Sequence, residues 1–128
     1  MKIIIDTHVA LWLFNEYENL SSMAKTQLCN EENELFISIV SAWEVAIKHS
    51  LGKLPGFQGG AKRFLATIYD SPIEIIGVLP YHIGRVESLP FIHRDPFDRL
   101  LIATTICEDM TIMTADSNIQ KYDVKYIW

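Results

Sequence analysis

The feature that most constrains the fold is a regular alternation between short apolar runs and longer segments with helical spacing. Ile3-Ile4-Ile5 is a continuous β-branched run, as expected of a strand that is buried on both faces. Further strands are expected at residues 35–39, 73–78, 111–114 and 124–128. Helices are expected at residues 9–13, 22–29, 41–51, 61–69, 80–89 and 96–108, and a short one from residue 117.

This alternation, with short connections throughout, predicts an α/β fold whose mainly parallel central sheet is flanked by helices. The chain has 128 residues and shows no internal repeat, low-complexity tract or linker, so we expect a single domain over residues 1–128. In a parallel sheet the carboxyl ends of the strands lie along one edge, and ligand sites form there.

Charge and cysteine content exclude several classes of protein. Eleven Lys and Arg against sixteen Asp and Glu give a net charge of −5, which argues against a broad basic face for nucleic acid. It leaves open an enzyme that holds a short stretch of nucleic acid through bound cations. Cys29 and Cys107 have no CxxC or Cys/His spacing, so a disulfide scaffold and a zinc site are not expected, and a reducing cytoplasm fits best.

The apolar N-terminus is not expected to act as a signal peptide. Asp6 and His8 interrupt the apolar run, and no small-residue cleavage site follows it. No apolar run in the chain is long enough to span a bilayer, so we expect a soluble protein with no membrane partner.

Four acidic residues occupy the positions that matter most in such a sheet. Asp6 ends the first expected strand, and Asp116 follows the strand at residues 111–114. Glu44 is expected in the first turn of the helix after the second strand, and Asp98 in the first turn of the helix that Pro96 opens. The topology therefore directs four carboxylates from distant parts of the chain toward one edge of the sheet.

Each acid also has a simpler explanation as part of a helix cap. Asp6 and Asp116 are suitable N-caps, and Ser41-x-x-Glu44 matches a capping box. Asp95 before Pro96 is a typical cap, for which Asp98 is a favourable first-turn acid. Capping needs no convergence, however, whereas clustered carboxylates need a cation to neutralise them. Oxygen ligands of this kind suit one or two Mg²⁺ or Mn²⁺ ions, which can support phosphodiester hydrolysis.

Four motifs follow one another along the chain: Ile-Ile-Ile-Asp-Thr-His at residues 3–8, Ser-Ile-Val-Ser-Ala-Trp-Glu at 38–44, His-Arg-Asp-Pro-Phe-Asp-Arg-Leu-Leu-Ile-Ala at 93–103, and Thr-Ala-Asp at 114–116. With these motifs the chain resembles the PIN-domain nucleases, and within them the VapC-like toxins of bacterial type II toxin–antitoxin pairs. The resemblance covers essentially the whole length, and its third motif is the most specific. It implies a PIN-like three-layer α/β fold.

The resemblance also implies an activity and a set of site residues. The family's usual activity is Mg²⁺- or Mn²⁺-dependent endonucleolytic cleavage of RNA. Its acidic metal-binding positions, which are also the catalytic ones, fall on Asp6, Glu44, Asp98 and Asp116. Residues near these positions are expected to support the ligands or contact the substrate: Thr7, Ser41, Thr114 and Arg99. A small antitoxin partner and a homodimer are further expectations from the family.

Physical reasoning assigns the same residues similar roles. Asp6 and Asp98 are expected as principal metal ligands, and Glu44 as a ligand or as an orienter of metal-bound water. Asp116 is expected to act through water, because Mg²⁺ keeps several waters. Thr114 is expected to hydrogen-bond a ligating carboxylate.

Several neighbouring residues have two readings. Lys48 lies one helical turn after Glu44, where an i,i+4 ion pair is favoured over a catalytic role. Arg94 and Arg99 flank the acidic motif and suit either substrate phosphates or a solvated face. His8 and His93 lie near the site, where a hydrogen-bonded structural imidazole is the common outcome.

Large aromatic residues are expected mainly in the core. We expect this of Trp12, Trp43, Phe64 and Trp128. Phe14 and Tyr17 are expected to help form an exposed apolar groove, of a kind that a partner helix could occupy.

Other enzyme classes fit less well. A haloacid-dehalogenase-like phosphatase needs a second acid two residues after the strand-end Asp, and position 8 is His. A receiver domain lacks its adjacent acid pair here, and neither a P-loop nor GxGxxG motif is present. The alternative that remains is a catalytically silent PIN-like domain that binds a protein partner.

Overall fold

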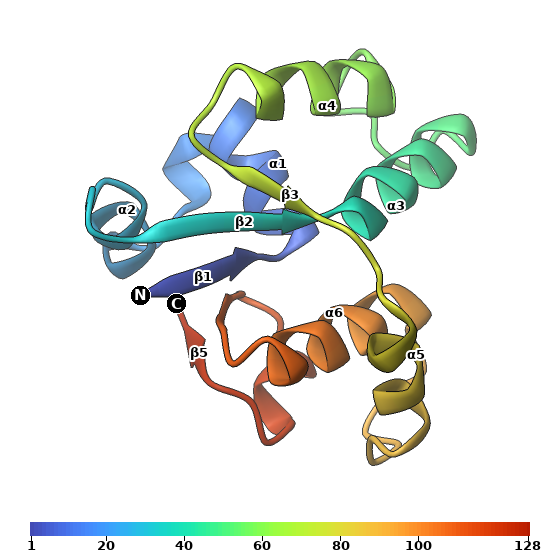
Figure 1. Cartoon of the computed structure of the whole chain (residues 1–128). Coiled ribbons are helices and arrows are strands. Elements are labelled where there is room, and N and C mark those ends of the chain that lie inside the picture. The colour runs from blue at the N-terminus through green and yellow to red at the C-terminus, as the bar shows by residue number, and fades with distance from the viewer.

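The computed structural model describes residues 1–128 and contains one sheet of five strands in the order β3-β2-β1-β4-β5 (Figure 1). The strands are β1 (Lys2–Ile5), β2 (Glu34–Ser38), β3 (Glu74–Ile76), β4 (Thr111–Met113) and β5 (Tyr126–Ile127). Every pair of neighbouring strands is parallel. The predicted α/β fold with a parallel sheet is confirmed, although β3 and β5 are shorter than their apolar runs suggested.

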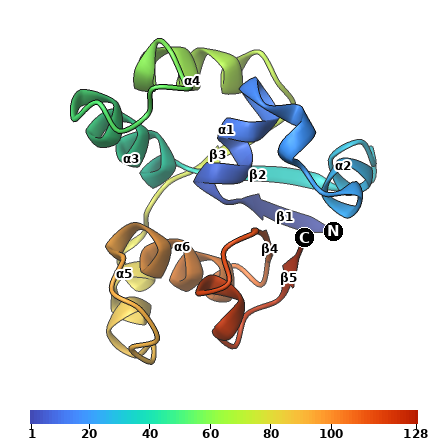
Figure 2. The ribbon, with the colours of Figure 1, turned by 180° about the vertical axis from the view of Figure 1, so that it is seen from behind.

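Helices cover both faces of the sheet, which gives the expected three layers (Figures 1 and 2). They are α1 (Thr7–Asn15), α2 (Ser22–Leu28), α3 (Ile39–Ser50), α4 (Gly60–Tyr69), α5 (Pro80–Glu87) and α6 (Pro96–Cys107), with 3₁₀ turns at Tyr17–Asn19 and Ile119–Lys121. Helices α1 to α4 pack on one face and α5 with α6 on the other. No helix combines the length and the apolar character that crossing a bilayer requires.

The central strand β1 joins two separate cores. Ile3 and Ile5 belong to a cluster of 16 buried residues on the α1–α4 face. Ile4, between them, belongs to a cluster of nine on the α5–α6 face. Successive side chains of a strand point to opposite faces, so a strand between two helical layers must be apolar at every position. This explains why three consecutive isoleucines form the strand that ends at Asp6.

The caps of the helices set the orientation of the acidic residues. Ser21 and Asp95 act as N-caps as predicted, accepting hydrogen bonds from the backbone N–H groups of Ala24 (3.0 Å) and Asp98 (2.9 Å). The predicted capping box at Ser41 is wrong. Helix α3 begins two residues earlier, at Ile39, and the hydroxyl of Ser38 accepts from the N–H of Val40 at 3.1 Å.

The early start of α3 has a local cause. Ser38 is the last residue of β2 and also a good N-cap, so strand and helix join without a loop. Glu44 consequently lies in the second turn of the helix and not in the first. Its carboxylate is too far along the helix to cap it, which leaves it free for other partners.

Among the aromatic residues, Trp12 and Trp128 pack together with ring centroids 5.7 Å apart, and Phe64 is fully buried. Trp43 was expected in the core, but 60% of it is exposed. It lies on the outer face of α3 and contacts Phe97 edge to face, at 5.2 Å between centroids. Val40, Ala42 and Val45 form the buried apolar face of α3, so the helix packs on the core without Trp43.

Candidate active site at the carboxyl edge of the sheet

The four predicted acids come from four different elements around the carboxyl ends of β1 and β4. Asp6 follows β1 directly, and Asp116 lies three residues after the end of β4. Glu44 lies in α3 and Asp98 in the first turn of α6. In Figure 1, β1 and β2 point toward the region of α3 and α6.

Asp6 is the most buried of these acids, with 3% of its surface exposed. Although it precedes α1 at the N-cap position, its carboxylate makes no capping bond. Instead, Thr114 Oγ1 donates to Asp6 Oδ2 at 2.8 Å. Burial raises the pKa of Asp6 to about 6, with smaller increases from the charges of Glu44 and Asp116, while Thr114 and His8 act to lower it.

The pKa of Asp98 is raised as well. Burial raises its pKa to about 7, and the charges of Asp6, Asp95 and Asp116 add to the increase. A hydrogen bond from His93, with 3.0 Å between Nε2 and Oδ2, acts to lower it. Asp6 and Asp98 are therefore close enough for the charge of one to act on the other, although 91 residues of chain lie between them.

Glu44 is held by a lysine of its own helix. Lys48 Nζ lies 2.5 Å from Glu44 Oε2, so the predicted i,i+4 ion pair is present. Burial alone would lower the pKa of Lys48, but its hydrogen bond to Glu44 and the charges of Glu44, Asp95 and Asp98 raise it. The lysine thus brings one positive charge to an otherwise acidic region.

Asp116 stabilises a turn rather than a helix end. Its Oδ1 accepts from the backbone N–H of Asn118 at 2.8 Å, and the following 3₁₀ helix begins only at Ile119. The backbone N–H of Asp116 itself donates to Thr114 Oγ1 at 3.0 Å. Thr114 therefore contacts both the Asp6 carboxylate and the backbone that carries Asp116, as expected of a residue that supports this site.

Thr7 and Ser41 have a less direct role than expected. The hydroxyl of Thr7 donates to that of Ser41 at 2.9 Å, and both side chains are buried. Neither hydroxyl bonds to any of the four acids. The pair joins the first turn of α1, next to Asp6, to the helix that carries Glu44.

Arg99 is buried, with only 5% of it exposed. Its guanidinium donates to the carbonyl of Pro90 (2.8 Å) and to the hydroxyl of Tyr122 (3.0 Å), with longer bonds to the carbonyls of Val86 and Leu89 (3.3 and 3.4 Å). Burial contradicts the solvated face that was one of the two expectations, and all four hydrogen bonds of the guanidinium go to the protein itself. The loop between α5 and α6 needs donors for its buried carbonyls, and Arg99 supplies them.

Sequence reasoning missed Tyr122 altogether. Its hydroxyl lies 2.9 Å from Nδ1 of His93, the residue whose Nε2 contacts Asp98. His93 itself follows the expected pattern of a hydrogen-bonded imidazole. No spacing in the sequence connects residues 93, 99 and 122, so only the fold could reveal this contact.

The donor chemistry suits a hard divalent cation, but the arrangement is not a ready-made ligand set. Carboxylate oxygens are the ligands that Mg²⁺ and Mn²⁺ prefer. A nearby cation would lower the raised pKa values of Asp6 and Asp98, because it favours the charged form of a carboxyl group. Even so, no three His, Cys, Asp or Glu side chains are arranged to hold a metal ion. Asp6, Glu44 and Asp98 each contact a protein donor instead.

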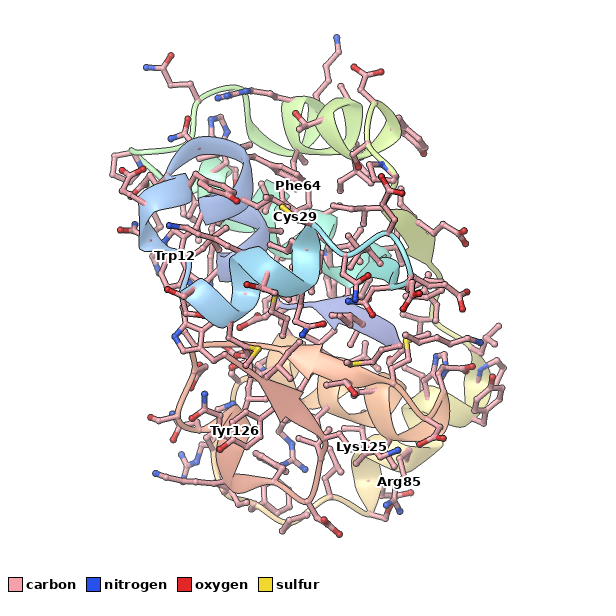
Figure 3. The ribbon with its side chains drawn as sticks, turned by 90° about the vertical axis from the view of Figure 1, so that its left-hand side faces the viewer. Trp12, Cys29, Phe64, Arg85, Lys125 and Tyr126 are labelled. Atoms are coloured by element: carbon pink, nitrogen blue, oxygen red, sulfur yellow. The ribbon has the colours of Figure 1, made fainter.

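A groove of about 460 Å³ lies elsewhere, between α1, α2 and the segment that joins α4 to β3. Phe14 and Tyr17 line it, as predicted, and none of the four acids does. Cys29, which also lines it, is labelled in Figure 3. Most of its lining is apolar: Leu13, Phe14, Tyr17, Leu28, Leu35, Pro72 and Ile73.

Fold and site together define an α/β protein with acidic side chains around the carboxyl edge of a parallel sheet, two of which, Asp6 and Asp98, have raised pKa values. The chain belongs to the PIN domain family, whose model matches residues 3–125. Ribonuclease VapC22 of Mycobacterium tuberculosis (strain ATCC 25618 / H37Rv) is 27% identical over 128 aligned positions, which cover 94% of this chain and 91% of that protein.

Solved structures show the same fold. VapBC2 of Rickettsia felis, bound to a DNA fragment from its promoter, matches with a TM-score of 0.73 at 15% identity, covering 99% of this chain and 98% of the other. DNA-bound VapBC of Salmonella typhimurium matches at 0.68 and 13% identity, covering 99% and 97%. A toxin–antitoxin complex of Klebsiella pneumoniae matches at 0.64 and 15%, covering 98% and 96%.

Proposed function

We propose that this protein is a metal-dependent endoribonuclease and the toxin of a type II toxin–antitoxin pair. The observation that carries the proposal is the placement of Asp6, directly after β1, and Asp98, in the first turn of α6, around the carboxyl edge of the sheet. Burial raises the pKa of both carboxyls, and the charge of Asp6 adds to the increase at Asp98. Family membership and the ribonuclease relative support the same reaction class.

In this proposal Asp6 and Asp98 are the principal ligands of one or two Mg²⁺ or Mn²⁺ ions. When bound, such an ion lowers the pKa of water and stabilises charge on the phosphate that is attacked. Glu44 is a further ligand or orients the attacking water, in exchange for its bond with Lys48, and Asp116 acts through water. Thr114 fixes the orientation of Asp6 by donating to Oδ2, which leaves Oδ1 for the ion.

The substrate we propose is RNA with unpaired bases. A chain of net charge −5 has no broad surface for a regular duplex, so bound cations and the shape of a single-stranded segment must provide recognition. We propose a cytoplasmic location, where RNA is available and where the two cysteines stay reduced; both are free here.

We further propose that the apolar groove beside α1 and α2 receives a segment of a small antitoxin. The structural neighbours include toxin–antitoxin complexes, and the groove has the apolar lining that an amphipathic segment requires. Phe14→Asp is expected to weaken binding of the antitoxin more than tenfold in calorimetry. Unchanged affinity would place the partner elsewhere.

A homodimer is proposed from exposed apolar side chains around α5. Tyr81 and Ile83 of α5, Phe91 of the next loop and Trp43 of α3 are each more than half exposed. Large apolar side chains left exposed on neighbouring elements are candidates for an interface between two copies of the chain. Sedimentation should show a dimer that Ile83→Asp converts to a monomer, and a monomeric wild type would contradict the proposal.

The main test is thermal unfolding of the partner-free protein with and without Mn²⁺. Binding to the folded state stabilises by about 2.7 kcal/mol at a concentration one hundred times Kd. Wild type is expected to show a shift in Tm that Asp98→Asn largely loses and that Asp123→Asn, an exposed control, retains. Without metal, Asp98→Asn should be no less stable than wild type, because a repelling charge is removed.

The same experiment distinguishes the nuclease from the alternative function, a catalytically silent PIN domain that binds a protein partner. That alternative is favoured by the absence of three side chains arranged to hold an ion. It predicts that Mn²⁺ shifts neither protein and that no RNA is cleaved. A Mn²⁺ shift together with metal-dependent cleavage of single-stranded RNA, both lost in Asp98→Asn, would exclude it.

A further inference from the structure

The loop that precedes Asp98 is hydrogen-bonded to Tyr122, a residue far along the sequence. Tyr122 is buried against this loop, and its ring contacts the ring of His93 edge to face at 5.4 Å between centroids. Its hydroxyl lies within hydrogen-bond distance of four groups: the imidazole, the backbone N–H and the backbone carbonyl of His93, and the guanidinium of Arg99.

Counting donors and acceptors assigns the protons in this network. A phenol has one proton to donate and two lone pairs to accept with. Arg99 Nη1 (3.0 Å) and the N–H of His93 (3.3 Å) are both donors, so together they use the two lone pairs. The single proton of Tyr122 then has two possible acceptors on His93, Nδ1 at 2.9 Å and the backbone carbonyl at 3.5 Å, and the shorter distance favours Nδ1.

This assignment decides what His93 offers to Asp98. With Nδ1 acting as an acceptor, the neutral imidazole carries its hydrogen on Nε2. Nε2 lies 3.0 Å from Asp98 Oδ2 and therefore donates to it. One carboxylate oxygen is fixed by this bond, and the other remains available to a ligand.

The arrangement around Asp6 is closely parallel. There a neutral donor, the hydroxyl of Thr114, also bonds to Oδ2 and leaves the second oxygen without a protein donor. Glu44, in contrast, is bound by a charged lysine. Each of the two acids that we take as principal ligands thus has its own neutral hydrogen-bond donor. Such a donor orients a carboxylate without cancelling its charge.

We propose that His93 is a positioning residue that orients Asp98 for metal binding, and that Tyr122 and Arg99 act through it by fixing its tautomer. This inference rests on the proposed metal-dependent function. Partners that orient metal ligands in this way typically change metal affinity by about 10–100-fold when they are removed.

The test combines Mn²⁺ calorimetry with ¹⁵N NMR of the histidine ring in the metal-free protein. Tyr122→Phe removes only the hydroxyl and should weaken Mn²⁺ binding about tenfold or more, as should His93→Ala. His93→Gln, whose side-chain N–H reaches a position like that of Nε2, should restore most of the affinity. Tyr126→Phe removes a hydroxyl from an exposed tyrosine and should bind as wild type does.

The NMR spectra report the tautomer without reference to activity. Wild type and Tyr126→Phe should show His93 with its hydrogen on Nε2, and Tyr122→Phe should show a mixture of both tautomers. A merely structural role would lower Tm in Tyr122→Phe but leave Mn²⁺ affinity unchanged. His93→Ala, at a partly exposed position, provides the same comparison if Tyr122→Phe does not fold.

The outcomes distinguish this inference from the function on which it rests. If wild type binds Mn²⁺, Asp98→Asn does not, and Tyr122→Phe and His93→Ala bind normally, the positioning role is wrong and the nuclease proposal stands. A wild type that binds no Mn²⁺ overturns the proposed function and the positioning role together. Loss of affinity in His93→Ala that His93→Gln does not restore also contradicts the role of the Nε2 donor.

Discussion

The two faces of the sheet are held by different kinds of contact. On the α1–α4 face, 16 buried apolar residues form the core, and Phe64 lies among the aromatic rings of Phe14 and Phe57 at 5.6 and 6.1 Å between centroids. On the α5–α6 face the apolar cluster has only nine buried residues. Arg99 and His82 are buried there as well, and both are hydrogen-bonded.

The contrast between apolar packing and hydrogen bonding indicates how precisely each face positions its residues. Apolar packing depends on total volume and tolerates small adjustments, whereas hydrogen bonds depend on direction. Asp98 lies on the polar face, at the end of a loop whose carbonyls are bound by Arg99. Asp98 is therefore presented by a face held in part by directional contacts, whereas Glu44 is presented by the face that apolar packing mainly holds, with the Thr7–Ser41 hydrogen bond in addition.

The largest loss of stability is expected from Phe64→Ala on the apolar face. Removing a buried aromatic ring typically costs about 3–5 kcal/mol, through lost transfer free energy and an unfilled cavity. Urea unfolding should show this loss. The Mn²⁺-induced shift in Tm of the remaining folded protein should match that of wild type, and a lost shift would mean that the two faces are not separable.

Arg99→Met should cost somewhat less but should affect both properties. The side-chain volume is largely kept, but the carbonyls of Pro90 and Leu89 lose their donor, and each unsatisfied buried group costs about 1–3 kcal/mol. We expect a total of about 2–4 kcal/mol in urea unfolding and a weaker Mn²⁺ response. An unchanged Mn²⁺ response would show that the polar face does not position Asp98.

The pH dependence of stability tests the acids that link the two faces. The pKa of Asp6 is raised to about 6 and that of Asp98 to about 7, above their values in the unfolded chain. Between about pH 4 and pH 7 the folded state therefore binds more protons than the unfolded state, so the free energy of unfolding of the metal-free protein falls as pH rises.

Comparison with the double variant Asp6→Asn/Asp98→Asn isolates this effect, because other titrating groups cancel. Relative to the double variant, wild type should lose roughly a few kcal/mol across this range, since each unit by which a pKa is raised corresponds to about 1.4 kcal/mol. Denaturant unfolding at pH 4, 5.5, 7 and 8 would measure it. Equal pH profiles for the two proteins would mean that neither carboxylate is perturbed in the folded state.

The smallest effects are expected at the two helix caps. Ser38→Ala should cost about 1 kcal/mol, since the N–H of Val40 loses its acceptor. Asp95→Asn keeps a capping oxygen but removes a charge that raises the pKa of Asp98. It should therefore raise Tm slightly in metal-free protein at pH 8, and a lowered Tm would show that its charge is favourable.

The elements and acids that sequence predicted have local signals. Ile3-Ile4-Ile5 indicates a doubly buried strand whatever surrounds it, and parallel topology then places Asp6 at the ligand-binding edge. The cap at α3 was misplaced because Ser38 and Ser41 are equally suitable, and only the end of β2 decides between them. Helical periodicity alone also placed Trp43 in the core.

The contacts that sequence missed are non-local. The roles of Arg99 and Tyr122 depend on a loop carbonyl and a ring that meet only when the 3₁₀ turn after β4 packs behind α6. Of the partners of the acids, the Lys48–Glu44 pair and the bond from Thr114 had signals in the sequence, whereas the link from Tyr122 through His93 to Asp98 had none. The identity of the bound ion stays a prediction.

The pairing of β1 with β4 also determines when the site can exist during synthesis. Ile3, Ile4 and Ile5 pair with Thr111, Ile112 and Met113, so the centre of the sheet closes only after all the residues between β1 and β4 have been made. Asp6 is made 108 residues before Thr114, the residue that donates to its carboxylate. The hydrogen bond that orients the Asp6 carboxylate is thus absent from the nascent chain until β4 and the residue after it have been made.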